Sequence, residues 1–245
     1  EKGKYDFAWL DDIVDQIIAR GMEPWIDLCY GNELYTPMAK EYFGAVGCAP
    51  IATEEELEGW LRYVKAVVTR YHGKVKWYEI WNEPDWCWKH GADATELGNF
   101  TVDTARVIRS VYPGARIIGG VLCDPSLDFI NRALATTDMA RWIDAISFHE
   151  YTADERSVPE RVRSLHACAD RYRPGIGIIQ GESGSQSRAG GNGALGGGKI
   201  HPHAAIRQQG SGGRAFRLVV AGAGRAGQRL AHGGRCGDPV PLVRQ

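Results

Sequence analysis

The sequence lacks several patterns that mark other classes of protein. It has no run of about 18 apolar residues, so no membrane-spanning helix is predicted. Its six cysteines include no C-x-x-C pair, which argues against a zinc knuckle or a redox motif. No G-x-G-x-x-G follows an apolar strand, so a dinucleotide site is not indicated. The formal net charge is only −1, and neither nucleic acid nor a membrane is therefore an expected partner.

The two ends of the chain differ in character. The chain starts at Glu1 in a polar run, with neither an initiator Met nor a signal peptide, which we interpret as a fragment or a processed product; the compartment stays unassigned. Residues 188–245 carry a charge of +8 and 15 of the 31 glycines, whereas residues 1–187 carry −9. A flexible basic arm and a stretch translated out of frame, switching near 196–199, both explain such a tail, and we favour the second. We predict an ordered domain over 1–195 and a poorly ordered tail over 196–245.

Apolar strands alternate with amphipathic helices through the ordered part. Helices are predicted at 6–21, 53–71, 96–111 and 157–172, with a short one opening at 124–125, and strands at 24–30, 76–82, 116–120, 143–149 and 176–181. Thr53 with Glu56 and Ser157 with Glu160 have capping-box spacing. Near-continuous apolar strands separated by helices indicate a parallel sheet covered by helices, either doubly wound or closed into a barrel.

A carboxylate follows two of these strands. Tyr78-Glu79-Ile80-Trp81-Asn82-Glu83-Pro84 puts Glu83 at a strand end, and Ile179-Gln180-Gly181-Glu182-Ser183 puts Glu182 at another, three strands later. The carboxyl ends of parallel strands share one edge of the sheet, where such folds place their chemistry. Asn82 and Glu83 are neighbours and would alternate between faces, so the strand must bend for both to reach one site.

These motifs resemble the retaining glycoside hydrolases of clan A, most closely family 39 and its neighbour family 5. The resemblance rests on W-N-E-P and G-E-S and covers about residues 5–195. It implies an incomplete (β/α)₈ TIM barrel in which strands three to seven are recognisable, strands one and two lie upstream of Glu1, and strand eight cannot be found.

The resemblance also implies a reaction, the hydrolysis of an O-glycosidic bond with retention. Two carboxyl groups about 5–5.5 Å apart are required for it. Glu83 matches the acid/base, Glu182 the nucleophile, and Asn82 the partner of the sugar 2-hydroxyl. His149 and Tyr151, after the preceding strand, are expected to orient Glu182. No cofactor and no metal ligand set is expected; the substrate is a β-linked glycoside, oligosaccharide or polysaccharide.

Aromatic and polar residues in the rim loops are candidates for sugar subsites. Trp86 and Trp88 follow the acid/base, and a tryptophan face stacks well on the apolar C–H face of a sugar, although the same side chains could simply cover the barrel rim. Tyr30 and Asn32 follow the first of the five strands and are weaker candidates.

Two other functions fit the same residues. Glu83, Glu182 and His149 could serve a metal-dependent sugar isomerase or lyase, although no acidic pair has metal-ligand spacing in the sequence. The chain could also be a carbohydrate-binding remnant or an inactive fragment, because a five-stranded part of a barrel leaves two open edges. Our interpretation is that the intact parent is an enzyme and that this chain alone has little or no activity.

Overall fold

The computed structural model describes residues 1–40, 49–87, 93–123, 126–151, 155–183 and 215–220. Its helices are α1 (Ala8–Ala19), η1 (Pro37–Lys40), α2 (Glu54–Arg70), α3 (Pro84–Cys87), α4 (Ala94–Val111), α5 (Leu127–Thr136), α6 (Met139–Trp142), η2 (Glu155–Ser157) and α7 (Val158–Ala169). Its strands are β1 (Glu23–Leu28), β2 (Trp77–Ile80), β3 (Arg116–Leu122), β4 (Ala145–Glu150), β5 (Gly177–Ser183) and β6 (Ala215–Val220). The five predicted strands correspond to β1 to β5, and the predicted helices alternate with them along the chain. No helix in the described part of the chain is long and apolar enough to cross a membrane.

The strands form one parallel sheet in the order β5-β4-β3-β2-β1-β6. The sheet curls strongly: a Cβ placed on Gly181 of β5 would lie 3.3 Å from Glu79 Oε1 of β2, although two strands separate them. A flat sheet would hold those strands about 14 Å apart, at roughly 4.8 Å per step. The prediction of an incomplete α/β barrel is therefore confirmed, and β1 to β5 correspond to strands three to seven.

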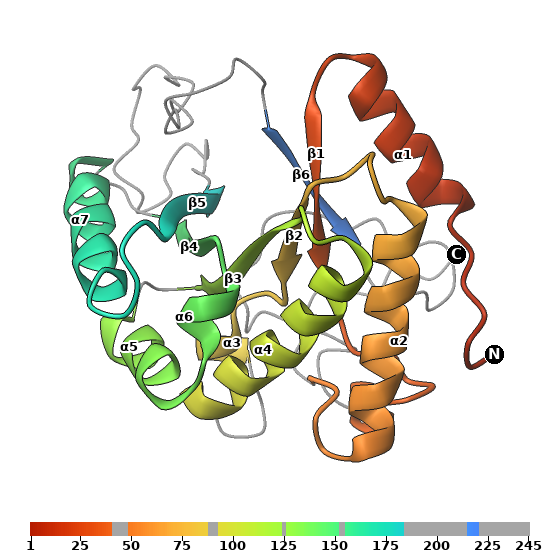
Figure 1. The fold of residues 1–245 in the computed structure, drawn as a ribbon, viewed down its shortest axis with the longest axis horizontal. Coiled ribbons are helices and arrows are strands. Elements are labelled where there is room, and N and C mark those ends of the chain that lie inside the picture. Colours follow the sequence, from red (N-terminus) through yellow and green to blue (C-terminus); the bar gives the residue numbers. More distant parts are fainter. Residues whose placement is uncertain (41–48, 88–92, 124–125, 152–154, 184–214, 221–245) are drawn as a thin grey trace, which may run out of the picture.

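The described helices lie on the convex face of this sheet, as an arc from α1 beside β1 to α7 beside β5 (Figure 1). The strand residues facing the helices are apolar and join one buried core with them; they include Ile26, Tyr78, Ile117, Ile146 and Ile178. Helix α2 contributes Trp60, Val64, Val67 and Val68, which recur at helical spacing. Burial of these apolar side chains packs the curved sheet against the helix layer.

The concave face carries a different set of side chains. Asp27 and Glu79 are register partners on β1 and β2, and both are fully buried. Ser147 of β4 is buried on the same face, where its hydroxyl would collide with any side chain at position 181. The described concave face therefore carries buried polar side chains below the carboxyl ends of the strands.

One described strand, β6, lies in the glycine-rich tail that we predicted to be poorly ordered. β6 pairs in parallel with β1, from Glu23↔Ala215 to Leu28↔Val220. It thus lies beside β1, where strand two lies in a complete barrel, whereas the sequence left strand eight unplaced. Strand eight would lie beside β5, and within the described residues no strand pairs with that edge. Residues 184–214 and 221–245 lie outside the described residues, so the predicted boundary at 195/196 stays a prediction.

The predicted helix caps are partly wrong. Thr53 caps α2 by accepting a hydrogen bond from the Glu56 backbone N–H, as expected, but the Glu56 carboxylate accepts from the backbone N–H of Ala52. Ser157 precedes α7 without a side-chain cap, because residues 155–157 already form the 3₁₀ turn η2 and Ser157 has helical dihedrals. Position 124–125, the predicted start of a short helix, lies outside the described residues; α5 is capped by Ser126.

Candidate active site

Glu83 lies just beyond β2, on a backbone bent out of the ladder. β2 ends at Ile80, and both Trp81 (φ 64°) and Glu83 (φ 49°) adopt the left-handed conformation. The Glu83 backbone N–H donates to the Val121 carbonyl of β3 at 2.9 Å. This is the bend that the neighbouring positions of Asn82 and Glu83 required. A non-glycine residue costs about 1–3 kcal/mol in this region, and such strain is typical of functional sites.

Packing around Trp81 holds the bend in place. The Trp81 side chain is fully buried, and its ring meets Tyr30, Trp60 and Phe100 at centroid distances of 5.8, 5.7 and 5.9 Å. On the other side of Glu83, the Asp85 carboxylate accepts a hydrogen bond from the Cys123 backbone N–H at the end of β3, at 2.8 Å. The strained segment is therefore anchored both before and after the carboxylate.

Three side chains from β2, β4 and β5 meet at the carboxyl ends of their strands. His149 of β4 is in register with Glu182 of β5, immediately after a register shift. The His149 Nδ1 atom lies 2.7 Å from Glu83 Oε1 and 3.9 Å from Glu182 Oε2. One ligand-type atom from each of the three residues lies within 4.8 Å of the other two. The structure thus brings together the two carboxylates that the motifs singled out.

The surroundings of the two carboxylates differ. The side chain of Glu83 is 9% exposed and that of Glu182 is 34% exposed. The Tyr151 hydroxyl donates a hydrogen bond to Glu182 Oε1. Glu83 is therefore the more buried of the two carboxylates, and Glu182 is the one that reaches solvent. Tyr151 lies against Glu182 as expected, and His149, expected at the same carboxylate, lies 3.9 Å from Glu182 Oε2 but closer, at 2.7 Å, to Glu83 Oε1.

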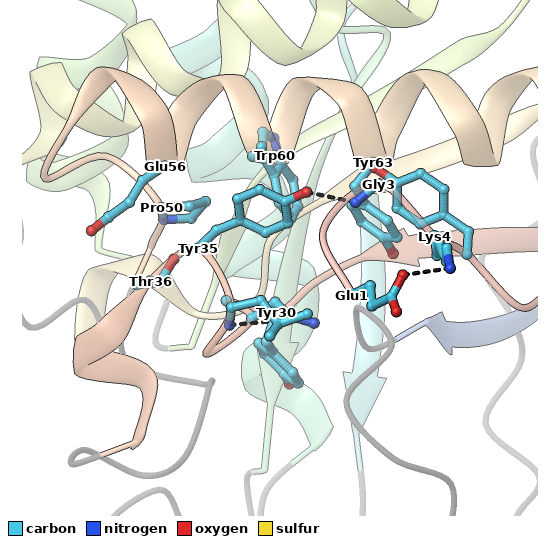
Figure 2. Close-up of a pocket in the computed structure, with 15 residues that line it drawn as sticks. Glu1, Gly3, Lys4, Tyr30, Tyr35, Thr36, Pro50, Glu56, Trp60 and Tyr63 are labelled. Atoms are coloured by element: carbon cyan, nitrogen blue, oxygen red, sulfur yellow. Dashed lines mark hydrogen bonds and ion pairs between the residues drawn. The ribbon is translucent and has the colours of Figure 1, made fainter.

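Tyr30 and Asn32 are not part of this cluster. They line a small cavity of about 70 Å³ under α2, together with Tyr35, Trp60 and Tyr63 (Figure 2). Ligand pockets usually measure about 300–1,000 Å³, so this cavity is small by comparison. The Asn32 side chain accepts from the Leu34 backbone N–H, which gives it a role in the loop after β1.

The remaining predicted residues are placed less completely. Asn82 is buried beside Glu83, with 7% of its surface exposed. Trp86 lies on α3, but its side chain is outside the described part of the chain, and Trp88 lies outside it altogether. Sequence reasoning overlooked Glu150, which is 8% exposed and forms an ion pair with Arg161 of α7 at 2.6 Å. The signal available in the sequence was its position between His149 and Tyr151. Side chains alternate between the two faces of a strand, so Glu150 points toward the helices when its neighbours point into the site.

The same cluster is also the one group among the described residues that could hold a metal ion. Its atoms are two carboxylate oxygens and one imidazole nitrogen, a mixture that suits zinc. The sequence offered these three residues as possible metal ligands although no acidic pair has metal-ligand spacing, and only the curl of the sheet brings them together.

Comparisons with known proteins agree with this architecture. A β-xylosidase of Geobacillus stearothermophilus is 26% identical over 159 residues, which is 61% of this chain and 31% of that protein. A solved family 39 β-xylosidase of Caulobacter crescentus superposes with a TM-score of 0.62 at 22% identity, over 77% of this chain and 43% of that one. A family 39 glycoside hydrolase of Bacteroides cellulosilyticus gives 0.61 at 20% identity, over 76% and 41%.

These structural likenesses establish the fold, and the chain spans less than half the length of the relatives it matches. The family assignment comes from the sequence model described as Glycosyl hydrolases family 39, which matches residues 1–170. Because that match covers well over half of the 245 residues, the chain belongs to glycosyl hydrolase family 39.

Proposed function

We propose that this site hydrolyses a β-linked O-glycoside with retention of configuration, with Glu83 as acid/base and Glu182 as nucleophile. One observation carries the proposal: Glu83 and Glu182 offer oxygens within 4.8 Å of each other at one rim of the curled sheet. Retaining enzymes place their two carboxyl groups about 5–5.5 Å apart, whereas inverting enzymes leave about 6.5–9.5 Å for a water molecule.

The reaction would proceed in two displacements. Glu182 attacks the anomeric carbon while Glu83 gives its proton to the leaving glycosidic oxygen, which produces a glycosyl ester on Glu182. Glu83, now a carboxylate, takes a proton from water as that water attacks the anomeric carbon. The ester bond breaks, the sugar leaves, and both carboxyl groups return to their starting states.

The neighbouring residues support these roles. Tyr151 donates to Glu182, which stabilises the carboxylate and directs it. His149 contacts Glu83, so it would hold the acid/base rather than the nucleophile. Asn82, buried next to Glu83, is placed to hydrogen-bond the sugar 2-hydroxyl, a contact that strengthens in the transition state.

A β-xyloside is the substrate we propose to test first. The Geobacillus relative and the Caulobacter structure are both named β-xylosidases. Trp86 and Trp88 stay candidates for stacking on further sugar units.

Covalent trapping tests the proposal without requiring full turnover. A 2-deoxy-2-fluoro-β-xyloside with a good leaving group slows the second displacement, so the full chain should gain the mass of one fluorosugar, located on Glu182 by peptide mapping. Glu182→Gln should gain none, and the control Glu160→Gln, which changes an exposed carboxylate on α7, should label like the wild type.

Labelling at another carboxylate would refute the assigned nucleophile. Absence of labelling, with a folded chain, would favour the inactive-fragment or sugar-binding alternative. Hydrolysis of an aryl β-xyloside that a chelator abolishes would favour the metal-dependent alternative.

A further inference from the structure

We propose that Glu83, His149 and Glu182 also form a binding site for one Zn²⁺ ion, and that bound metal excludes the glycoside. The inhibitory consequence rests on the proposed function, because the metal and the sugar would use the same carboxylates. The binding itself rests only on the arrangement of three side chains.

The ligand types favour zinc among the common divalent cations. Catalytic zinc sites are made by three protein ligands drawn from His and Asp or Glu, with one position left for water. Glu83, His149 and Glu182 supply two carboxylates and one imidazole. Ca²⁺ needs six to eight oxygen ligands and Mg²⁺ an octahedral, mostly oxygen shell, so neither suits this set.

The spacing of the three atoms is close to what zinc needs. Zinc–ligand bonds of about 2.0–2.2 Å in a tetrahedron put the ligand atoms about 3.3–3.6 Å apart. The measured separations from His149 Nδ1 are 2.7 Å to Glu83 Oε1 and 3.9 Å to Glu182 Oε2, which bracket that value. All three atoms lie within 4.8 Å of one another, so one or both carboxylates would have to move by about 1 Å to complete a zinc shell.

The site is rigid on one side and open on the other. His149 is 1% exposed and stands in the β4–β5 ladder opposite Glu182. Glu83 is fixed by the anchored bend after β2, whereas the Glu182 side chain is 34% exposed and reaches the surface. Metal therefore has an entry path from solvent, and the ligands lose little side-chain freedom on binding.

The test is metal binding by the full-length chain. Zn²⁺ is titrated by calorimetry and Co²⁺ by visible absorption, because tetrahedral Co²⁺ gives intense d–d bands. We expect one site per chain, and no heat with Mg²⁺ or Ca²⁺. Loss of an outer-shell partner alone weakens metal binding about 10–100-fold, so Glu182→Gln or Glu83→Gln should weaken it by about 100-fold or more.

Two controls separate this site from other histidines and carboxylates. His72→Ala removes an imidazole that stacks on Tyr112, and Glu160→Gln removes an exposed carboxylate; both should bind Zn²⁺ like the wild type. Equal affinity in the wild type and the triple variant Glu83→Gln, His149→Gln, Glu182→Gln would overturn the proposal, since the metal would then bind elsewhere.

The outcome is independent of whether the chain is an active glycosidase. If fluorosugar labelling fails while Zn²⁺ still binds, the proposed function and its inhibition by zinc are refuted. The proposed metal site is then unaffected. Labelling that Zn²⁺ does not slow, at concentrations that saturate the calorimetric site, would overturn the claim that metal excludes the glycoside.

Discussion

At the scale of single residues, the site depends on positions whose environment is set by contacts far away in the sequence. Glu83 is held in a left-handed backbone by β3, and its carboxylate meets His149 of β4. W-N-E-P was enough to single out Glu83 and Asn82 and to require a bend. It could not show that His149 pairs with Glu83, because the direction of a side chain at a strand end depends on the register shift between Phe148 and His149.

Replacing Tyr151 by Phe should impair the nucleophile while leaving the fold intact. The variant loses the hydrogen bond to Glu182, and a bond to a charged group is worth about 1.5–3 kcal/mol, or about 10–150-fold in rate. The rate of fluorosugar labelling measures this. Tyr172→Phe is the control, since its hydroxyl contacts Asn131 on the surface; an equal loss in both variants would contradict a specific role for Tyr151.

Replacing Gly181 by Ala should destabilise the sheet. The new methyl group would overlap Ser147 Oγ and approach Glu79 Oε1 to 3.3 Å, and overpacking of this kind costs about 1–3 kcal/mol. Urea unfolding measures the free energy. Gly175→Ala is a poor control because its φ is positive, so the test is rescue: Ser147→Gly should recover part of the loss in the double variant. Additive losses would show that the two residues do not meet.

At the scale of elements, helices and strands formed where the apolar period and the caps indicated. α1, α2, α4 and α7 overlap the predicted helices, and β1 to β5 overlap the predicted strands. The short helices α3 and α6 were missed, because four residues are too few for a periodic signal. The sequence also could not predict which helices contact each other, as the contact between α1 and α2 shows.

Asp11 joins α1 to α2 and should make stability depend on pH. It accepts hydrogen bonds from Arg70 at 3.0 and 2.5 Å and from the Tyr71 hydroxyl at 3.0 Å, and the Arg70 bond lowers the pKa of Asp11 below its usual value. A lowered folded pKa adds stability above the unfolded value of about 3.9, and this stability is lost as the pH falls through the folded pKa.

Asp11→Asn should therefore be less stable than the wild type at neutral pH, and the difference should shrink below about pH 4. Unfolding by urea across this range measures it. Asp12→Asn on the same helix, where the carboxylate contacts Gln16 of its own helix, should show a smaller pH dependence. A difference for Asp11→Asn that is constant down to the lowest pH would contradict the argument.

At the scale of the whole molecule, the curled sheet joins distant parts of the chain into one rim. β2 and β5 are separated by about a hundred residues of sequence, yet the Glu79 carboxylate of β2 reaches across the interior to Gly181 of β5. β6 extends the other end of the sheet beside β1. The position of β6 was not predictable, because a single apolar run in a glycine-rich tail does not say which edge it joins.

Truncation tests whether β6 belongs to the folded unit. A chain ending at residue 183 loses β6, whereas one ending at residue 220 keeps it. At about 0.5–1.5 kcal/mol per ladder hydrogen bond, we expect the shorter chain to be about 2–4 kcal/mol less stable. Urea unfolding and amide exchange of β1 measure this. Equal stability and equal protection of β1 would show that the tail contributes nothing, in agreement with the predicted boundary at 195/196.

The sequence by itself determined a parallel α/β fold, the succession of helices and strands along the chain, and the two carboxylates worth examining. It could do so because periodicity, caps and short motifs are local, and each strand end is marked by its own residues. Only the tertiary structure decided that Glu83, His149 and Glu182 share one site and that Tyr30 and Asn32 lie in a separate small cavity. The physical reason is curvature: the angle between successive strands, set by packing under the helices, fixes which strand ends meet, and no local pattern records it.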